Sequence, residues 1–296
     1  MKVRFAVTPS ASAVAEDQFD EYLRACETLG FDTVWLSDIP LGPTGDPLVS
    51  LAYAAARTSR LKLGMNVVPL GRNPLWLAKQ LAQLDRLSGG RLLLTFVPGL
   101  GQPTERAALG YTTGDRGKDI DRIIDLMRSW WSGAAVTDTF GPWTYNGVQV
   151  APTPLQSPLE IWLGGIGPVA LDRVARLADG WLTAAATPSE AADGRRIIQD
   201  RAAAVGRTVD EDHFGISIPY CRDEPAESVV AALKRRRPDG DVTQILPVGG
   251  RALGELVRAH IDGGLTKFVL RPIAGGLDDW RDDLAWLADH VLALQT

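Results

Sequence analysis

Short runs of residues that favour β-strands alternate along this chain with longer amphipathic patterns typical of helices, and this alternation constrains the fold most. The expected strands span residues 3–7, 33–36, 63–68, 92–97, 161–163, 180–183, 215–218 and 268–270. The expected helices span residues 19–29, 48–58, 75–87, 119–131, 169–178, 189–204, 226–236 and 279–293. Strands that alternate with helices form parallel βαβ units. Eight such units in 296 residues predict an α/β fold, a (β/α)8 TIM barrel, with a doubly wound open sheet as the alternative.

The alternation is interrupted in two places, which we expect to be insertions at the C-terminal mouth of the barrel. Residues 99–117 are irregular, and residues 133–158 contain a turn or hairpin at 140–147 followed by a proline-rich crossing. No linker-like or low-complexity segment divides the chain. We therefore expect a single domain over residues 1–296.

Composition excludes several classes of function. The net charge of −5 leaves no basic surplus for nucleic acid, and no apolar run has the length of a membrane span. The first residues lack the apolar core of a signal peptide, and the two cysteines, Cys26 and Cys221, form no metal or redox motif. These features predict a cytoplasmic protein with reduced thiols and a small-molecule substrate.

A glycine-rich turn follows the expected strand at residues 161–163. Gly164, Gly165, Ile166 and Gly167 lead into Pro168, which suits the first turn of a helix because its missing N–H needs no partner there. Glycines let the backbone approach a ligand closely, and the N–H groups and dipole of a helix N-terminus favour an anion. The loop is therefore a candidate phosphate site, with a plain tight turn as the alternative.

Active sites of TIM barrels lie at the C-terminal ends of the strands, so polar residues there are candidates. Asp38 follows the second expected strand and either binds a ligand or caps the next turn. Tyr220 and Cys221 follow the seventh. Several arginines fall in the same loops and provide either a positive field for an anionic ligand or ordinary surface charge: Arg72, Arg106, Arg116, Arg222 and Arg271.

The three histidines argue against metal or triad chemistry. His213 precedes an expected strand, while His260 and His290 lie in helical patterns, so none falls at a C-terminal strand end. A Ser-His-Asp triad or a histidine-ligated metal is therefore not expected. A phosphate loop without such groups indicates that a bound organic cofactor carries the reaction.

Several blocks of the sequence together resemble the luciferase-like monooxygenase family, which includes flavin-dependent and coenzyme F420-dependent oxidoreductases. These blocks keep the family's order over residues 1 to about 185: Gly30–Asp38, Asp46–Leu48, Leu61–Pro74, Ala78–Lys79, Leu84–Leu92, Leu109–Gly110, Trp131–Gly133, Ile161–Gly165 and Ala178–Trp181. The resemblance implies a TIM barrel, a homodimer and a cofactor phosphate at Gly164–Gly167. It also implies a non-prolyl cis peptide bond at Asn66–Val67 behind the cofactor ring, with Asp38 near that ring.

The sequence departs from the family at the walls of the ring site. Ile39 and Leu100 stand where a branch with a sugar-phosphate substrate has histidine and glutamate, and Thr95 and Val97 replace glycine-rich positions. We expect the ring near Asp38, Asn66, Val67 and Thr95.

The resemblance and the residues together predict an oxidoreductase that transfers hydride between coenzyme F420, a deazaflavin, and a small organic substrate. Arg72 and Arg106 suit the charged tail of F420, and the candidate proton donors are Asp38, Tyr220 and Cys221. The alternatives are an FMN-dependent monooxygenase and a non-catalytic flavin- or deazaflavin-binding protein on the same scaffold. A metal-free isomerase or aldolase of sugar phosphates fits less well, because no acid–base pair or Schiff-base lysine stands at a strand end.

Overall fold

Eight parallel strands close into a barrel in the order β1-β10-β9-β8-β7-β4-β3-β2. The computed structural model describes residues 2–10, 14–99, 101–111, 114–237, 240–273 and 279–296; Leu100 lies outside this part of the chain. The barrel strands are β1 (Arg4–Val7), β2 (Thr33–Ser37), β3 (Lys62–Val67), β4 (Leu92–Phe96), β7 (Ile161–Leu163), β8 (Gly180–Ala184), β9 (Phe214–Tyr220) and β10 (Lys267–Pro272). The predicted TIM barrel is confirmed, and the open-sheet alternative is wrong.

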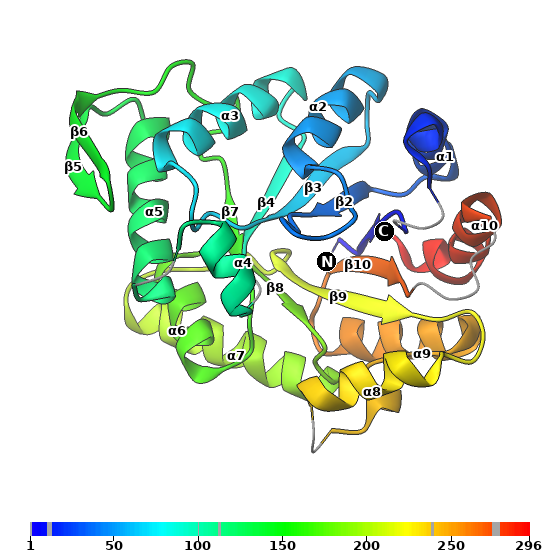
Figure 1. The fold of residues 1–296 in the computed structure, drawn as a ribbon. Coiled ribbons are helices and arrows are strands. Elements are labelled where there is room, and N and C mark those ends of the chain that lie inside the picture. The colour runs from blue at the N-terminus through cyan, green and yellow to red at the C-terminus, as the bar shows by residue number, and fades with distance from the viewer. Residues whose placement is uncertain (1, 11–13, 100, 112–113, 238–239, 274–278) are drawn as a thin grey trace. The chain divides into compact units, whose positions relative to one another are not determined.

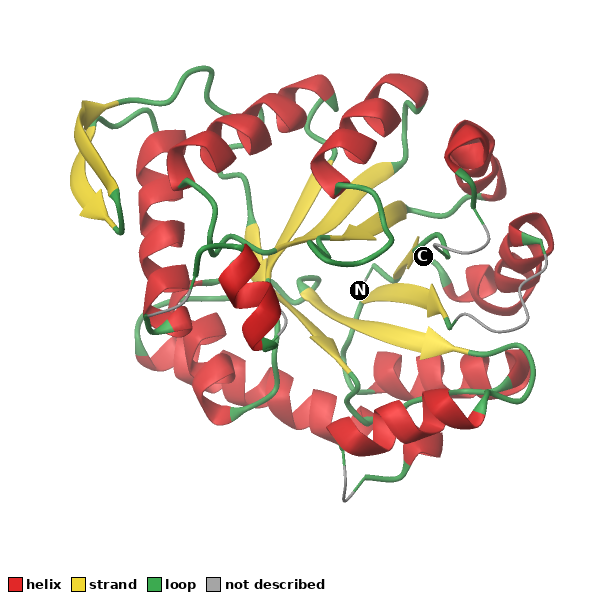
Figure 2. Cartoon of the chain, in the orientation of Figure 1, coloured by secondary structure: helices red, strands yellow, loops and turns green. Residues whose placement is uncertain are grey.

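Helices follow the strands along the chain (Figures 1 and 2). They are α1 (Phe19–Leu29), α2 (Pro47–Arg57), α3 (Pro74–Leu87), α4 (Pro103–Ala108), α5 (Arg116–Trp131), α6 (Pro168–Leu177), α7 (Pro188–Ala204), α8 (Glu227–Arg236), α9 (Gly249–Asp262) and α10 (Trp280–Val291). Short 3₁₀ turns lie at Glu16–Gln18, Val242–Gln244 and Leu292–Leu294. The expected hairpin is the antiparallel pair β5 (Val136–Phe140) and β6 (Trp143–Val148). Two helices were not predicted from the sequence. Helix α4 lies inside a segment expected to be irregular, and α9 lies between α8 and β10.

Helix starts follow local sequence signals. Proline stands at the first position of α2 and α3, and the preceding Asp46 and Asn73 accept backbone N–H groups of the first turn with their side chains. Thr187 and Glu190 form a reciprocal capping box at the start of α7. These caps satisfy N–H groups that have no partner inside the helix, so the sequence itself determines where these helices begin.

The chain divides into two compact units: residues 1–35, 60–62 and 162–296 form unit one, and residues 36–59 and 63–161 form unit two. Unit one contains the ladder β8-β9-β10-β1, in which Arg4–Val7 pair with Lys267–Leu270. Unit two contains the β3–β4 ladder, helices α2 to α5 and the hairpin.

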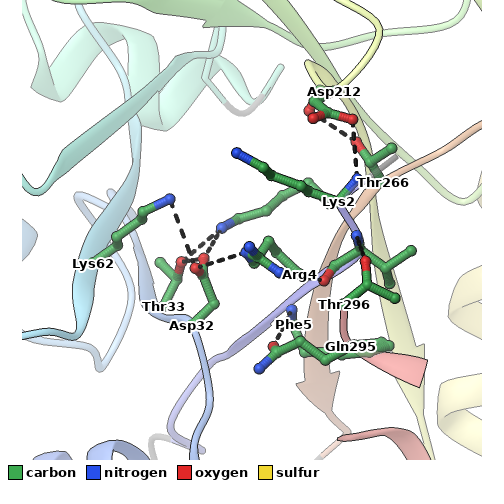
Figure 3. Close-up of polar contacts among 12 residues, drawn as sticks. Lys2, Arg4, Phe5, Asp32, Thr33, Lys62, Asp212, Thr266, Gln295 and Thr296 are labelled. Atoms are coloured by element: carbon green, nitrogen blue, oxygen red, sulfur yellow. Dashed lines mark hydrogen bonds and ion pairs between the residues drawn. The ribbon is translucent and has the colours of Figure 1, made fainter. Parts of the chain in front are cut away.

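A buried ion cluster joins the first and last strands in unit one (Figure 3). The ammonium of Lys267, on β10, donates to Asp32 and, over 2.7 Å, to Thr33 Oγ1. Lys62 and Arg4 lie 3.6 and 3.5 Å from the same Asp32 carboxylate. Burial lowers the pKa of Lys267 to about 8, an effect that Asp32 partly offsets. Burial alone would raise the pKa of Asp32, but Lys267 and Lys62 reverse this, so its net shift is downward.

The C-terminus is fastened beside this cluster (Figure 3). Gln295 Oε1 accepts the N–H of Phe5 over 3.2 Å, and Thr296 exchanges hydrogen bonds with Val3. Hydrogen bonds made by Gln295 and Thr296 therefore attach the C-terminal residues to Val3 and Phe5, at the start of β1.

Unit two is held by a buried carboxylate of its own. Asp85, fully buried on α3, accepts the backbone N–H groups of Leu155 and Gln156 over 2.7 and 2.8 Å, and the Gln156 side chain over 2.6 Å. Arg91, just before β4, donates to backbone carbonyls of Ala55 and Thr58 at the end of α2. Asp85 and Arg91, both in the block Leu84–Leu92, therefore have structural roles, and their presence requires no catalytic role.

Asp32→Asn should destabilise the protein more than Lys267→Met. The first change leaves a buried ammonium with neutral acceptors in place of its carboxylate, and breaking a buried ion pair in this way costs about 3 kcal/mol or more. After the second change, the Asp32 carboxylate keeps Thr33, Lys62 and Arg4 nearby. Urea unfolding of the two single variants and the double variant measures this. Equal losses in the singles, or additive losses in the double, would contradict it.

A pH-dependent stability follows from His260. Its ring is fully buried in α9, neither ring nitrogen has a hydrogen-bond partner in the described structure, and burial lowers its pKa to about 4. Between pH 6.5 and 4 the unfolded chain binds a proton that the folded chain does not, so stability should fall as the pH falls. The loss reaches about 3 kcal/mol near pH 4.

Urea unfolding of the wild type and of His260→Leu at pH 7 and pH 4 isolates this effect. The leucine variant should show a smaller difference in unfolding free energy between the two pH values. The same difference in both proteins would mean that His260 is not the responsible group.

Candidate functional site

Asp38, just after β2, organises a polar cluster in unit two. Its backbone N–H donates to the carbonyl of Asn66 over 2.9 Å. Its Oδ2 accepts the N–H of Val68 over 3.1 Å and the Arg72 guanidinium over 2.9 Å. Arg72 also lies 3.8 Å from Asp46. The carboxylate thus ties the end of β2 to the end of β3 and holds the arginine that follows, and both of these contacts use Oδ2.

Thr95 lies beside Asn66 because the β3–β4 register pairs these two residues. Register partners in a parallel pair place their side chains on the same face, so Asn66 and Thr95 share one face and Val67 points to the other. Asn66 donates its side-chain amide to Ser37 Oγ over 2.9 Å. The Thr95 hydroxyl is buried and has no hydrogen-bond partner in the part of the chain described. A buried hydroxyl without a partner is costly, so this atom suits contact with a ligand.

The expected cis peptide bond at Asn66–Val67 is wrong. In the described ranges the cis bonds are Ala151–Pro152 and Ser157–Pro158. β3 pairs regularly with β4 through Val67, whose carbonyl accepts the N–H of Val97 over 2.9 Å. A continuous ladder needs extended trans backbone at each position, and a non-prolyl cis bond would add about 3 kcal/mol.

Arg106, expected to contact a cofactor, lies half-exposed on α4. Its neighbour Glu105 is 2% exposed, and neither of its carboxylate oxygens has a partner among the residues that the structure describes. Leu109, just past α4, lies against Gly71, where a Cβ would come 2.4 Å from the Leu109 carbonyl oxygen. Sequence reasoning missed Glu105, because a glutamate on a short helix is ordinarily a surface residue and only tertiary packing shows its burial.

The glycine loop after β7, in unit one, has the features of an anion site. Gly164 is half-exposed and Gly165, Ile166 and Gly167 are exposed. A Cβ on Gly164 would lie 3.0 Å from the Leu182 carbonyl oxygen. Gly165 has φ +99°, and a Cβ there would lie 2.8 Å from Ala170. Gly165 therefore requires glycine, and Gly164 leaves little room for a larger side chain.

The helix that follows the loop begins without a side-chain cap. Gly167 is the N-cap of α6 and offers no side chain to the N–H groups of the first turn. Trp181 Nε1 donates to the Gly165 carbonyl over 2.8 Å and holds the loop in place. A phosphate fits this arrangement, because exposed N–H groups and the helix dipole both favour an anion there.

The side chains of Tyr220 and Cys221, also in unit one, contact other parts of the protein interior. The Tyr220 hydroxyl donates to Asp283 on α10 over 2.5 Å, and its ring stacks on Trp286 of the same helix. Burial and the nearby Asp283 raise the pKa of Tyr220. Cys221 packs with Leu233, Val242 and Leu246, and burial raises the pKa of its thiol. The tyrosine therefore faces the helical layer.

The described residues contain no group of three or more His, Cys, Asp or Glu side chains that could hold a metal ion. None of the helices in the ranges described is long and apolar enough to cross a membrane. His213 precedes β9, and His260 and His290 lie in α9 and α10, as the sequence indicates.

Solved structures share this fold. Coenzyme F420-dependent tetrahydromethanopterin reductase from Methanopyrus kandleri has a TM-score of 0.76 and 18% identity over 100% of both chains. An F420-dependent secondary alcohol dehydrogenase, in complex with an F420–acetone adduct, has a TM-score of 0.80 and 16% identity, again over both whole chains. The oxygenating constituent of 3,6-diketocamphane monooxygenase from Pseudomonas putida, in complex with FMN, has a TM-score of 0.79 and 15% identity over 100% of this chain and 99% of that one.

Curated relatives include uncharacterised proteins of Mycobacterium tuberculosis and Mycobacterium bovis, each 34% identical over 175 residues. The match covers 55% of this chain and 58% of theirs, so the chain spans a little over half the length of these relatives. The model of the luciferase-like monooxygenase family matches residues 2–259. This chain therefore belongs to the luciferase-like monooxygenase family.

Proposed function

We propose that this chain is an oxidoreductase that uses coenzyme F420 to reduce a small organic substrate. The observation that carries the proposal is the exposed glycine loop before the uncapped α6, in a family member whose structural neighbours include two F420-dependent enzymes. When bound, the deazaflavin would supply the hydride. The neighbour solved with an F420–acetone adduct supports small carbonyl compounds as the substrate class.

Each unit offers candidate contacts of its own for the cofactor. Backbone N–H groups of Gly164, Gly165, Ile166 and Gly167 would hold its phosphate. Asn66 and Thr95 would contact its ring through their side chains and Val67 through its backbone, with the unpartnered Thr95 hydroxyl offering a hydrogen bond. Arg72 and Arg106 would attract its charged tail. Among described residues Arg106 forms no ion pair, whereas the Arg72 guanidinium forms ion pairs with Asp38 and Asp46.

Among the three proton-donor candidates, the geometry supports Asp38 best. Hydride addition to a carbonyl leaves an oxygen that needs a proton. Tyr220 commits its hydroxyl to Asp283, and Cys221 lies in an apolar cluster. Asp38 is held by Val68 and Arg72 through Oδ2, so in its protonated form the acid would carry the proton on Oδ1 and give it to the substrate oxygen, leaving the carboxylate paired with Arg72.

The homodimer remains a proposal drawn from the family. Exposed apolar side chains on the neighbouring helices α2 and α3 support it: Val49, Tyr53 and Trp76.

Titration of the purified protein with F420 and with FMN tests the cofactor. F420 should change its absorption and fluorescence on binding, and Gly165→Val should weaken its affinity roughly tenfold or more, because the side chain disturbs the anion-binding loop. Gly206→Ala is the matched control. Its φ is +71°, so the substitution is strained as well, but nothing lies within 4 Å of the added Cβ.

Tight FMN binding without F420 binding would overturn the proposal in favour of an FMN-dependent monooxygenase. If neither cofactor binds at micromolar concentration, the chain is a non-catalytic protein on this scaffold.

Asp38→Asn should lower the turnover of reduced F420 with small carbonyl substrates by roughly 10²-fold or more, the range for loss of a general acid. Tyr220→Phe and Cys221→Ala should change turnover little, since both side chains serve packing. The pH–rate profile of the asparagine variant should lose one limb. A large loss in the tyrosine variant, with Asp38→Asn near wild type, would assign the proton to Tyr220 instead.

A further inference from the structure

Helix α8 leaves the C-terminal end of β9 and returns through the 3₁₀ turn Val242–Gln244 to α9. Its base is closed by two backbone hydrogen bonds, in which Cys221 N–H donates to Pro247 over 3.1 Å and Gly249 N–H donates to Cys221 over 2.8 Å. Leu233, Val242 and Leu246 pack around Cys221 as a small apolar cluster. Besides this base and cluster, a third contact attaches α8 to the rest of unit one.

Arg237, immediately after α8, supplies that attachment. Its guanidinium donates to the Ala185 carbonyl over 2.5 Å and to both carboxylate oxygens of Glu190, one of them over 2.8 Å. A bidentate arginine–carboxylate pair is stronger and more specific in direction than a single ion pair. Arg237 lowers the pKa of Glu190 to about 2, so the carboxylate stays charged at physiological pH.

The turn that Arg237 binds through the Ala185 carbonyl is strained. Ala185 has φ 52°, the sole positive φ at a non-glycine residue in the ranges described, and it directly follows β8. A left-handed conformation is unfavourable for alanine and persists where surrounding contacts enforce it. Arg237 binds the Ala185 carbonyl from one side, and Glu190 accepts the Thr187 N–H over 2.8 Å from the other.

We propose that Arg237 is a latch that holds α8 closed on the β8–α7 turn, residues 184–190, and that its release admits ligand to this end of the barrel. β8 and β9 are paired neighbours, so their C-terminal ends stand side by side. In TIM barrels this end binds the ligand, and loops that close over it control entry and release. The part concerning ligand entry rests on the proposed function; the latch itself does not.

Hydrogen exchange of the ligand-free protein tests the latch. Arg237→Gln should speed amide exchange in α8 and in the β8–α7 turn roughly tenfold to hundredfold, the change expected for loss of hydrogen bonds to a charged group. Peptides from β1 and β10 should stay unchanged. Glu190→Gln is the second variant, since glutamine can still accept the Thr187 N–H and preserve the start of α7.

Two variants serve as controls. Arg196→Gln removes an equal charge from α7, where Arg196 pairs with Asp193 and Asp200 at the surface, and should leave exchange in α8 unchanged. Ala185→Gly removes the backbone strain but not the ion pair, so α8 should stay as protected as in the wild type. Unchanged exchange in α8 for both Arg237→Gln and Glu190→Gln, or equal acceleration throughout the barrel, would overturn the latch.

Stopped-flow mixing with F420 tests ligand entry separately. Arg237→Gln should raise the association and dissociation rates together by several-fold, with little change in affinity, because a latch controls passage rather than contacts. Faster exchange in α8 with unchanged ligand rates would keep the latch and overturn its control of entry. If F420 does not bind at all, the proposed function fails while the exchange data still decide the latch.

Discussion

A single ammonium group, that of Lys267, sits where the last strand of the barrel meets the first. A parallel barrel closes only if β10 pairs with β1, and four residue pairs of backbone ladder hold this seam. The Lys267 side chain reaches Asp32 and Thr33 at the start of β2, so β10 is also bound to the strand beyond β1. Because a buried charge without its partner is very costly, any arrangement that separates β10 from β2 is strongly disfavoured.

The remainder of unit one depends on that closure. Gln295 and Thr296 can bind the edge of β1 only when the end of the chain has returned to its beginning. The register of β8, β9 and β10 then determines which residues reach the ends of these strands. The charged cluster lies at the N-terminal ends of the strands, and the loops with ligand-binding features follow the C-terminal ends. The charged cluster that stabilises the barrel and the loops proposed to bind ligand therefore lie at opposite ends of the strands, as is general for this fold.

Several features that oppose stability lie at or beyond the C-terminal halves of barrel strands. Gly165 and Ala185 both have positive φ, and Thr95 and Glu105 are buried without partners in the described structure. Each feature opposes stability, and features of this kind persist in proteins mainly where binding requires them. Both compact units carry such features: Gly165 and Ala185 lie in unit one, and Thr95 and Glu105 lie in unit two. In TIM barrels, variation in the segments after the strands produces different chemistries.

Local signals in the sequence identify most of the elements and their order. Prolines stand at the first positions of α2, α3 and α6, and the run of glycines before Pro168 predicts a turn in which the backbone can approach a ligand. At two positions the structure differs from what these local signals and the family resemblance predict. Tyr220 stands at a strand end, as predicted, but the alternation of side chains along β9 turns it toward α10. The family's cis peptide bond is absent at Asn66–Val67, because the β3–β4 ladder continues through it.

By itself, therefore, the sequence determined the eight strands, most of the helices, the barrel, the family and the glycine loop, since these depend on periodicity, caps and backbone freedom within short segments. Only the tertiary structure decided which polar groups are paired. The partners of Asp32, Asp38 and Glu190 lie 235, 34 and 47 residues away in the chain. Contacts at such separations follow from barrel closure and strand register, and no local pattern encodes them.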